Sequence, residues 1–511
     1  MNRRDFIVHS AAGLAGVAGA SLIGTSANLY ANGNPKPMKR PKNVLLLFSD
    51  QHRPDTLGCY GNSIVKTPNI DRLAKHGVRF DNAFTPTATC SPARTCVQTG
   101  VLAHRHRIMF NSGGPSKKCG GAHNLSDEWP AFASSLKEKG YNLAHVGKWH
   151  IGVENRPADF GYEGVFYPYY GYPAGHKHYL NYLKELGVGG FNLSEVTHHP
   201  EQKRFRYSGI QEGPVEASAP GYLASQTVDY IDKFARDDKP FFVSCNFWGP
   251  HAPYFIPEKY FRMYEGVDIE PWPNFRYDQS DKPRIYEQYG RYWGVDRFSR
   301  KQLSDLIARY YGYITLIDEQ VGRILKTLED TGQLEDTLII YSADHGATVG
   351  SHGMWDKGFG MHDCTQRIPL VVSHAGLRGK GAVSDEFVTL MDFAPTFLEQ
   401  AGCPVPETCD GKSLWPAIDH PEKARRRDHV ICEHFGHQMP FWQRMVRDDR
   451  YKYVYNPTDV DEFYDLENDP HEMTNLAARI DKARIEPYRD RLREFIERTG
   501  DPMKQWARTT L

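Results

Sequence analysis

The stretch NVLLLFSD, residues 43–50, decides the fold. Its apolar residues from Val44 to Phe48 follow one another without alternation, which is typical of a central parallel strand buried on both faces. A Pro/Lys-rich segment precedes this run and a polar turn follows it. Asp50 therefore lies at the carboxyl end of the predicted strand, the edge at which open α/β sheets carry their sites.

Four further short apolar runs have the same character and lie at residues 143–146, 241–244, 338–341 and 370–373. They alternate with segments of helical character at residues 69–76, 132–139 and 306–328. A glycine, which is a typical helix stop, directly follows the first two of these helices. The alternation predicts an α/β fold with a doubly wound sheet flanked by helices.

Two regions depart from this alternation. Residues 161–300 are rich in Tyr, Phe, Trp, Pro and Gly and have few periodic segments, so we expect long loops over the sheet there. Residues 425–511 carry strand patterns at 444–446 and 451–455 and a helix pattern at 487–498. They predict a smaller C-terminal α+β subdomain with a small antiparallel sheet.

The N-terminus has the pattern of an export signal. Arg3 and Arg4 precede a mild Ala/Gly-rich apolar run over residues 11–24. Paired arginines favour the twin-arginine route and predict a signal over residues 1–31, with an uncleaved N-terminal anchor as the alternative. We therefore expect an exported protein that is periplasmic or extracellular, either free or associated with the cell surface.

Composition excludes some partners. The 511 residues include 62 basic and 63 acidic side chains, so the net charge of −1 offers no long-range attraction to nucleic acid. No stretch after the signal has the roughly 20 apolar residues that a membrane span needs. The nine cysteines include no CxxC pair, which argues against zinc knuckles. Export permits disulfides, and Cys403 and Cys409 are the nearest sequence pair.

The segment Cys90-Ser91-Pro92-Ala93-Arg94 is the motif with the clearest chemical content. Proline favours the first turn of a helix and Ser91 is a good N-cap, so we expect Cys90 at the positive end of a helix, which attracts anions. A thiolate there would be activated, whereas a lone cysteine is more often a buried structural residue. The spacing alone leaves both interpretations open.

Cys-x-Pro-x-Arg, with a downstream Thr-Gly, resembles the signature of type I sulfatases, the formylglycine-dependent family of the alkaline phosphatase superfamily. The likeness extends over nearly the whole chain after the leader, through blocks at residues 147–152, 250–253, 342–346, 350–353 and 463–466. It implies a sulfuric ester hydrolase with a large mixed, mostly parallel sheet and a catalytic domain over residues 32–424. It also implies that a formylglycine-generating maturation enzyme oxidises Cys90 to formylglycine.

Asp50 and Asp344 both end predicted strands and offer the oxygen ligands that a hard divalent cation prefers. By resemblance, Gln51 and His345 take the remaining metal positions beside the modified Cys90. Many relatives carry a second Asp and an Asn at those two positions, so this set holds fewer carboxylates. The resemblance implies one divalent metal, with Ca²⁺ as the family default and Mn²⁺ as the alternative for a site with a nitrogen ligand.

The resemblance also assigns the proton transfers. One oxygen of hydrated formylglycine attacks sulfur, and its second hydroxyl permits release of sulfate by elimination. His251, assisted by Lys357, matches the acid that protonates the leaving alcohol, and His150 matches the group that helps deprotonate the second hydroxyl. Arg94 and Lys148 match the cations that hold the nucleophile and the sulfate oxygens.

Taken one at a time, these residues have ordinary explanations. Asp50 or Asp344 would cap a helix, and Lys148 or Arg94 would join a surface ion pair. The ordered set of motifs favours the catalytic interpretation. His352 has two equal interpretations, because it either contacts substrate or braces its own Gly-x-His-Gly turn.

Two other functions fit parts of the sequence. Asp50-Gln51 and Asp344-His345 resemble the metal set of formylglycine-dependent phosphonate monoester hydrolases, so a phosphonate monoester or phosphodiester hydrolase is the main alternative. The Lys148-Trp149-His150 block and the export signal favour the sulfatase. A catalytically dead carbohydrate-binding protein that keeps the fold would retain an unmodified Cys90.

Export and aromatic loops together favour a sulfated glycan as the substrate. Such aromatic rings stack on sugars as flat apolar platforms, although they more often pack the loops that carry them. The candidates are Tyr167, Tyr169, Tyr170, Tyr172, Trp248, Tyr254, Trp272 and Trp293. Neither the sugar nor the sulfated position follows from the sequence.

Overall fold

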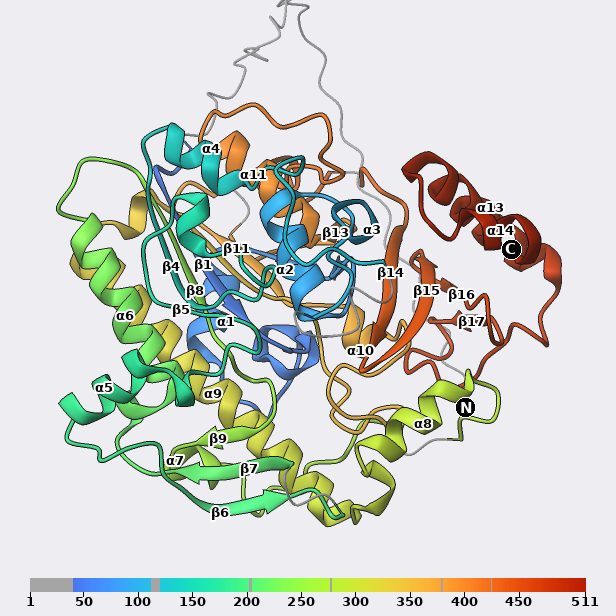
Figure 1. The fold of residues 1–511 in the computed structure, drawn as a ribbon, viewed down its shortest axis with the longest axis horizontal. Helices are drawn as coiled ribbons and strands as arrows, with labels where there is room; N and C mark the ends of the chain where they lie inside the picture. The colour runs from blue at the N-terminus through green and yellow to red at the C-terminus, as the bar shows by residue number, and fades with distance from the viewer. Residues whose placement is uncertain (1–39, 112–119, 202–204, 276–277, 378–379, 424) are drawn as a thin grey trace, which may run out of the picture. The chain divides into compact units, whose positions relative to one another are not determined.

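The predicted strand at residues 43–48 is β1 (Asn43–Ser49), which lies inside an eight-stranded sheet (Figure 1). The computed structural model describes residues 40–511 except 112–119, 202–204, 276–277, 378–379 and 424, so the expected signal at 1–31 lies outside the described residues. From edge to edge the strands are β12 (Ala382–Ser384), β2 (Val78–Phe80), β11 (Leu370–Ser373), β10 (Thr337–Ala343), β1, β8 (Phe241–Asn246), β4 (Asn142–Lys148) and β5 (Phe166–Tyr167).

The sheet is mixed and mostly parallel, which confirms the predicted fold class. β1 pairs in parallel with β10 and with β8, and β8 pairs in parallel with β4. Only β11 runs antiparallel to its neighbours β10 and β2 among the described strands of this sheet. The carboxyl ends of β10, β1, β8 and β4 therefore meet at one edge, where the chain leaves each strand for a loop.

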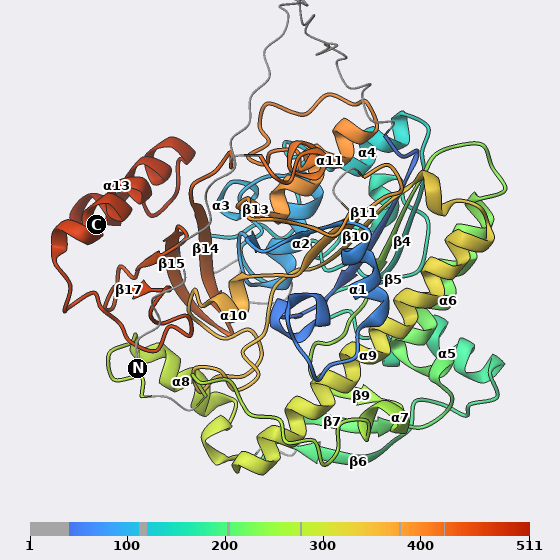
Figure 2. The same cartoon turned by 180° about the vertical axis from the view of Figure 1, so that it is seen from behind.

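Helices cover both faces of this sheet (Figures 1 and 2). On one face α1 (Pro68–Lys75), α6 (Ala219–Phe234) and α9 (Arg300–Asp330) share a core with Leu45 and Leu47 of β1. On the other face α2 (Cys90–Thr99), α4 (Phe132–Glu138) and α11 (Phe393–Gln400) share a core with Val44 and Leu46. Burial of β1 on both faces explains why its apolar residues follow one another without alternation.

The expectation of long loops over residues 161–300 is wrong. Besides α6 and β8, this region forms a three-stranded sheet of β6 (Leu193–His198), β7 (Arg206–Gln211) and β9 (Tyr254–Ile256). It also contains α5 (Lys177–Glu185), α7 (Glu258–Phe261) and α8 (Arg284–Tyr292). Aromatic residues such as Tyr179 and Tyr207 are buried in the main core, so tertiary packing supplies order that local periodicity does not reveal.

The C-terminal part folds as predicted into a small antiparallel sheet with helices. Its strands are β14 (Val430–His437), β15 (Met439–Arg447), β16 (Tyr451–Tyr455) and β17 (Glu462–Asp465), and its helices are α13 (Lys482–Thr499) and α14 (Lys504–Thr510). The helix expected at 487–498 begins earlier, because the Asp481 carboxylate caps it by accepting from the Ala483 amide at 2.9 Å. Pro487 therefore lies inside α13.

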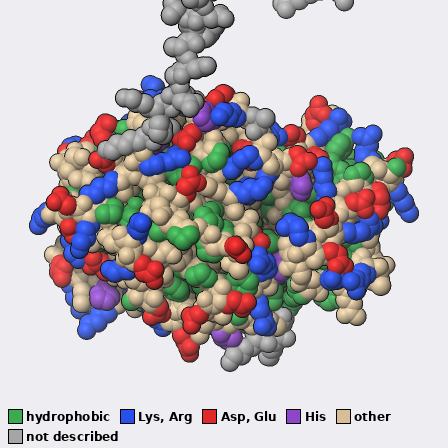
Figure 3. Space-filling model, turned by 90° about the horizontal axis from the view of Figure 1, so that it is seen from above, with side chains coloured by type: hydrophobic (Ala, Val, Ile, Leu, Met, Phe, Trp, Pro, Cys, Tyr) green, Lys and Arg blue, Asp and Glu red, His purple; other side chains and the backbone are tan. Residues whose placement is uncertain are grey.

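The remaining elements are short: α3 (Ala103–His106), α10 (Asp363–Gln366), α12 (Trp415–Asp419), β3 (Ala83–Phe84) and β13 (Val388–Thr389). No helix in the described part of the chain is long and apolar enough to cross a membrane. The eight described cysteines are all free, including Cys403 and Cys409. Basic and acidic side chains are interspersed over the face seen in Figure 3, as the balanced composition predicts.

Candidate active site

Cys90 is the first residue of α2 and its side chain is buried. The expectation that Ser91 caps this helix is wrong, because the helix begins two residues earlier than that cap implies, after Thr89 in an extended conformation. The Ser91 hydroxyl instead donates to the carbonyl oxygen of His150 at 2.5 Å. The position of Cys90 at the positive end of a helix is as expected, and this end favours negative charge at its side chain.

The two predicted strand-end carboxylates lie beside Cys90. β1 and β10 pair in parallel with Ser49 opposite Ala343, so Asp50 and Asp344 leave the sheet next to one another. The ligand atoms of Asp50, Cys90, Asp344 and His345 all lie within 4.8 Å of one another. All four side chains are buried. The sheet register thus brings together Asp50 and His345, which are 295 positions apart in sequence.

This cluster has the donors that a divalent cation needs. His345 Nδ1 lies 2.8 Å from the carbonyl oxygen of Gly346, to which it donates, and this orients Nε2 toward the cluster. Nε2 lies 3.3 Å from Cys90 Sγ and 3.6 Å from Asp344 Oδ1. The Gln51 side-chain amide nitrogen is buried and has no hydrogen-bond partner among the described residues. Two carboxylates and one imidazole fit a hard cation that tolerates nitrogen, while the Gln51 side-chain oxygen accepts from Lys357 Nζ at 3.5 Å.

Two buried cations neutralise the carboxylates. Arg94 donates from Nε to Asp344 Oδ2 at 2.9 Å and from Nη2 to Asp50 Oδ2 at 3.1 Å. Lys148 Nζ lies 2.5 Å from the same Asp50 oxygen. Burial alone would raise the pKa of Asp50, but the charges of Lys148 and Arg94 hold it well below its usual range. The site is therefore a set of fixed, paired charges.

His251 and Lys357 form a close pair at the other side of the cavity. His251 Nδ1 lies 2.6 Å from the Ala252 carbonyl oxygen, to which it donates, so Nε2 accepts from Lys357 Nζ at 3.1 Å. Burial and the Lys357 charge lower the pKa of His251 to about 3. Although burial opposes it, the Asp356 carboxylate 2.9 Å away raises the pKa of Lys357. The proton of this pair therefore resides on Lys357, and His251 is neutral at neutral pH.

His150 follows β4 and is also neutral. Burial and the charges of Lys148 and Arg94 lower its pKa well below the usual range. Its Nδ1 is buried and has no hydrogen-bond partner among the described residues. A neutral imidazole with an unused nitrogen is suited to accept a proton.

His352 is not brought to this site. Its ring stacks on that of His362, with centroids 3.6 Å apart and planes 9° apart, and its Nε2 lies 3.0 Å from the amide nitrogen of Asn274. It does not line the cavity described below. Its side chain therefore packs against His362 and Asn274.

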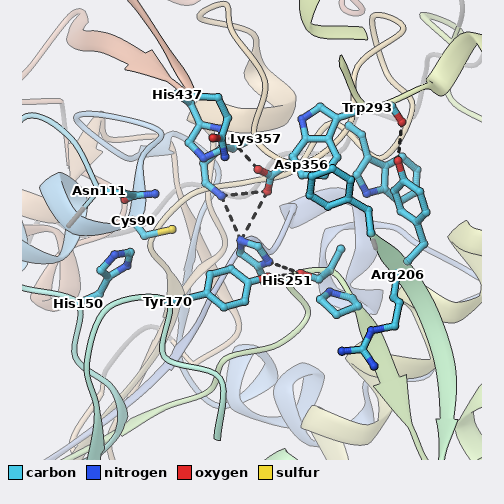
Figure 4. A pocket seen from close by; sticks show the side chains of 16 residues that line it. Cys90, Asn111, His150, Tyr170, Arg206, His251, Trp293, Asp356, Lys357 and His437 are labelled. Atoms are coloured by element: carbon cyan, nitrogen blue, oxygen red, sulfur yellow. Dashed lines mark hydrogen bonds and ion pairs between the residues drawn. The ribbon is translucent and has the colours of Figure 1, made fainter. Parts of the chain in front are cut away.

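A cavity of about 350 Å³ opens beside Cys90 (Figure 4). Cys90, His150, His251 and Lys357 line its inner end. The sequence interpretation missed several other lining residues, namely Asn111, Asp356, His437 and Gln438. Asp356 could have been predicted from the sequence, since it directly precedes the candidate residue Lys357.

The C-terminal sheet contributes to this cavity through His437 at the end of β14. His437 Nδ1 lies 2.7 Å from the Tyr289 hydroxyl and 3.5 Å from Asp356 Oδ2. Asp356 thus links the C-terminal strand to Lys357. No local pattern around His437 predicts this contact, because it arises from the docking of the C-terminal sheet.

The aromatic candidates divide between cavity and core. Tyr170 and Trp293 line the cavity. Tyr167, Trp248 and Tyr254 are buried, as packing residues are. Trp272 instead stacks against the Arg53 guanidinium, 3.7 Å from its ring centre.

A buried cysteine at a helix end, a strand-end carboxylate cluster and two neutral histidines define a hydrolytic enzyme of the alkaline phosphatase-like fold. The sulfatase family model matches residues 42–403, and a model described as N-sulphoglucosamine sulphohydrolase, C-terminal, matches residues 350–499. The chain therefore belongs to the sulfatase family, whose members hydrolyse sulfuric esters.

Three similar proteins illustrate this membership. An uncharacterized sulfatase of Escherichia coli is 29% identical and is matched over 92% of this chain and 90% of its own length. An N-acetylglucosamine-6-O-sulfatase of Bacteroides thetaiotaomicron is 25% identical over 95% of this chain and 90% of its own. The crystal structure of a phosphonate monoester hydrolase of Agrobacterium radiobacter superposes with a TM-score of 0.75 at 26% identity, covering 90% of this chain and 96% of that one.

Proposed function

We propose that the protein hydrolyses sulfate esters of glycans with a formylglycine made from Cys90. The observation that carries this proposal is the convergence of Asp50, Asp344 and His345 on the Cys90 side chain. Gln51, Asp50, Asp344 and His345 would hold one divalent cation beside the nucleophile. When bound, such a cation supplies positive charge that offsets the charge of the sulfate group.

The first chemical step replaces the ester oxygen on sulfur. One hydroxyl of hydrated formylglycine at position 90 loses its proton to water and attacks sulfur. The bond from sulfur to the ester oxygen breaks, and the leaving alkoxide takes up a proton. Lys357 holds that proton in the resting enzyme and His251 lies 3.1 Å from it, so the pair delivers it together. Arg94 and Lys148 provide fixed positive charge at the inner end of the cavity.

The second step regenerates the aldehyde. His150 takes the proton of the remaining hydroxyl, the carbon to oxygen bond of the sulfate ester on the enzyme breaks, and sulfate leaves. Water then hydrates the aldehyde. Lys357 regains a proton from water and His150 releases one, so the net reaction consumes one water and yields an alcohol, sulfate and one proton.

Support for a glycan substrate comes from the N-acetylglucosamine-6-O-sulfatase relative and from the aromatic residues Tyr170 and Trp293 in the cavity. We further propose that the protein is exported and depends on a formylglycine-generating maturation enzyme. Ca²⁺ is the expected metal, with Mn²⁺ as the alternative because of the His345 nitrogen.

A second candidate function is phosphonate monoester or phosphodiester hydrolysis. It is favoured by the Gln51 and His345 positions and by the likeness to the phosphonate monoester hydrolase of Agrobacterium radiobacter. The two candidates are separated by measuring kcat/KM on nitrophenyl sulfate and on a nitrophenyl phosphonate monoester with the same purified enzyme. We expect the sulfate ester to be the better substrate, and a preference for the phosphonate would overturn the proposal. A screen of defined sulfated saccharides then identifies the sugar.

A further inference from the structure

Arg206 is the cation that the described residues place at the outer end of the cavity. This residue is the first of β7 and is exposed, and Figure 4 shows it across the cavity from Cys90. Its guanidinium carbon lies 5.1 Å from the ring centre of Phe255 in β9. β9 continues the segment that carries His251, so one stretch of chain holds both the proposed leaving-group acid and the surface on which Arg206 rests.

Arg206 has no acidic partner among the described residues, whereas the other cations at the cavity do. Lys357 is paired with Asp356, which is also the only carboxylate among the described residues that line the cavity. The internal segments outside the described residues, 112–119, 202–204, 276–277, 378–379 and 424, contain no Asp or Glu. The exposed Arg206 guanidinium is therefore available to an anionic group of a bound molecule.

The wall between Cys90 and Arg206 suits a saccharide. Tyr170 and Trp293 line the cavity there, and aromatic faces pack well against the apolar faces of sugar rings. A sulfate ester at the inner end would place the rest of its sugar along this wall. Groups on that sugar, or on the next one, would then approach Arg206.

We propose that Arg206 binds a second anionic group on the substrate, either a carboxylate or a second sulfate. The planar guanidinium makes paired hydrogen bonds to either group. This inference rests on the proposed function and narrows its substrate class from sulfated glycans to polyanionic saccharides. Arg206 is a specificity-determining residue that takes no part in the proton transfers.

The test compares three disaccharides that share one scissile sulfate. The first has that sulfate as its single charged group, the second carries an additional sulfate, and the third carries an additional uronate carboxylate. We expect the wild type to favour one or both dianionic substrates in kcat/KM. In Arg206→Gln this preference should fall by about three- to tenfold, the range for an exposed charge-assisted contact, mainly through KM. Arg206→Lys should retain part of the preference, and high salt should weaken it.

Arg236→Gln is the matched control, since Arg236 is also exposed, has no acidic partner among the described residues and does not line the cavity. It should keep the wild-type preference. Equal preference in wild type and Arg206→Gln, or no preference in wild type, would overturn the inference. The response to each dianionic substrate tells whether the carboxylate or the second sulfate is the ligand.

Dissociation constants of the same saccharides, measured in a Cys90→Ala background, make the test independent of turnover. A loss of the dianion preference in binding upon Arg206→Gln supports the inference even if catalysis is slow. Hydrolysis of nitrophenyl sulfate by the wild type tests the proposed sulfatase activity separately from the role of Arg206. If the wild type hydrolyses nitrophenyl sulfate but Arg206→Gln does not change the preference among the saccharides, the sulfatase proposal stands and the specificity inference alone is refuted.

Discussion

The inner and outer ends of the cavity use charge in opposite ways. At the inner end Arg94 and Lys148 are buried and paired with Asp50, and Arg94 is also paired with Asp344. At the outer end Arg206 is exposed and lacks an acidic partner among the described residues. Buried paired charges are expensive to disturb, whereas an exposed cation is available to a ligand. The difference indicates that the inner end fixes the reaction and the outer end selects the substrate.

The largest effect is expected at the centre of the inner end. Cys90→Ala should reduce kcat on nitrophenyl sulfate on the order of 10⁴-fold or more, because it removes the precursor of the nucleophile. The fold should persist, since the change removes only the buried thiol group of one side chain. Circular dichroism and thermal unfolding provide the structural control, and more than trace turnover would contradict the mechanism.

The next largest effect is expected for the carboxylates. Asp50→Ala should lower kcat by about a hundred- to a thousandfold on the same substrate. It should also destabilise the fold by about 3 kcal/mol or more, because Lys148 and Arg94 would be left buried without this partner. Denaturant unfolding measures the second effect.

Metal removal tests the same cluster without a mutation. Treatment with a chelator should lower activity, and added Ca²⁺ or Mn²⁺ should restore it in the wild type but not in Asp50→Ala. His345→Asn is the milder comparison, since it keeps a neutral ligand. Full activity in metal-free enzyme would refute the cation site.

Replacement of His251 and replacement of His150 should differ in how the loss of activity depends on the substrate. His251→Ala should cost about a hundred- to ten-thousandfold on an alkyl or sugar sulfate, whose alkoxide is strongly basic, and much less on nitrophenyl sulfate, whose leaving group hardly needs a proton. His150→Ala should slow both esters under saturating conditions and let a covalent sulfo-enzyme accumulate. Equal losses on both esters in both variants, with no sulfo-enzyme, would show that the acid and base are assigned wrongly.

The smallest effect is expected at the outer wall. Trp293→Ala should raise KM for a sulfated disaccharide by about three- to tenfold and leave nitrophenyl sulfate less affected, since the lost stacking is worth about 1 kcal/mol. Trp272→Ala is the matched control, because Trp272 stacks on Arg53 away from the cavity. Similar KM changes in both variants would contradict a specific role for Trp293.

The sequence predicted the parts of this site that follow strands of the main sheet. Asp50 and Asp344 come directly after unbroken apolar runs, and the parallel pairing of β1 with β10 makes their meeting a consequence of fold class. The small C-terminal sheet was also predicted, although β14 and β17 were not. Its strands pair with strands that are close in sequence, so their residue patterns were sufficient to predict the sheet.

Contacts that depend on tertiary packing were not predictable. His437 reaches Asp356 only because the C-terminal sheet docks against the main domain, and no spacing encodes that approach. The region 161–300 was expected to be loops, yet Tyr179 and Tyr207 are buried in the main core. Its order comes from aromatic packing between distant segments, which single-sequence periodicity does not detect.

The most direct test of the central claim is mass spectrometry of the proteolytic peptide that contains position 90, paired with turnover of nitrophenyl sulfate by the same preparation. The enzyme is produced together with a formylglycine-generating maturation enzyme. The account predicts a peptide in which the Cys90 thiol and one hydrogen are replaced by a carbonyl oxygen, and activity in proportion to that fraction. A preparation with full turnover and only unmodified cysteine at position 90 would contradict it.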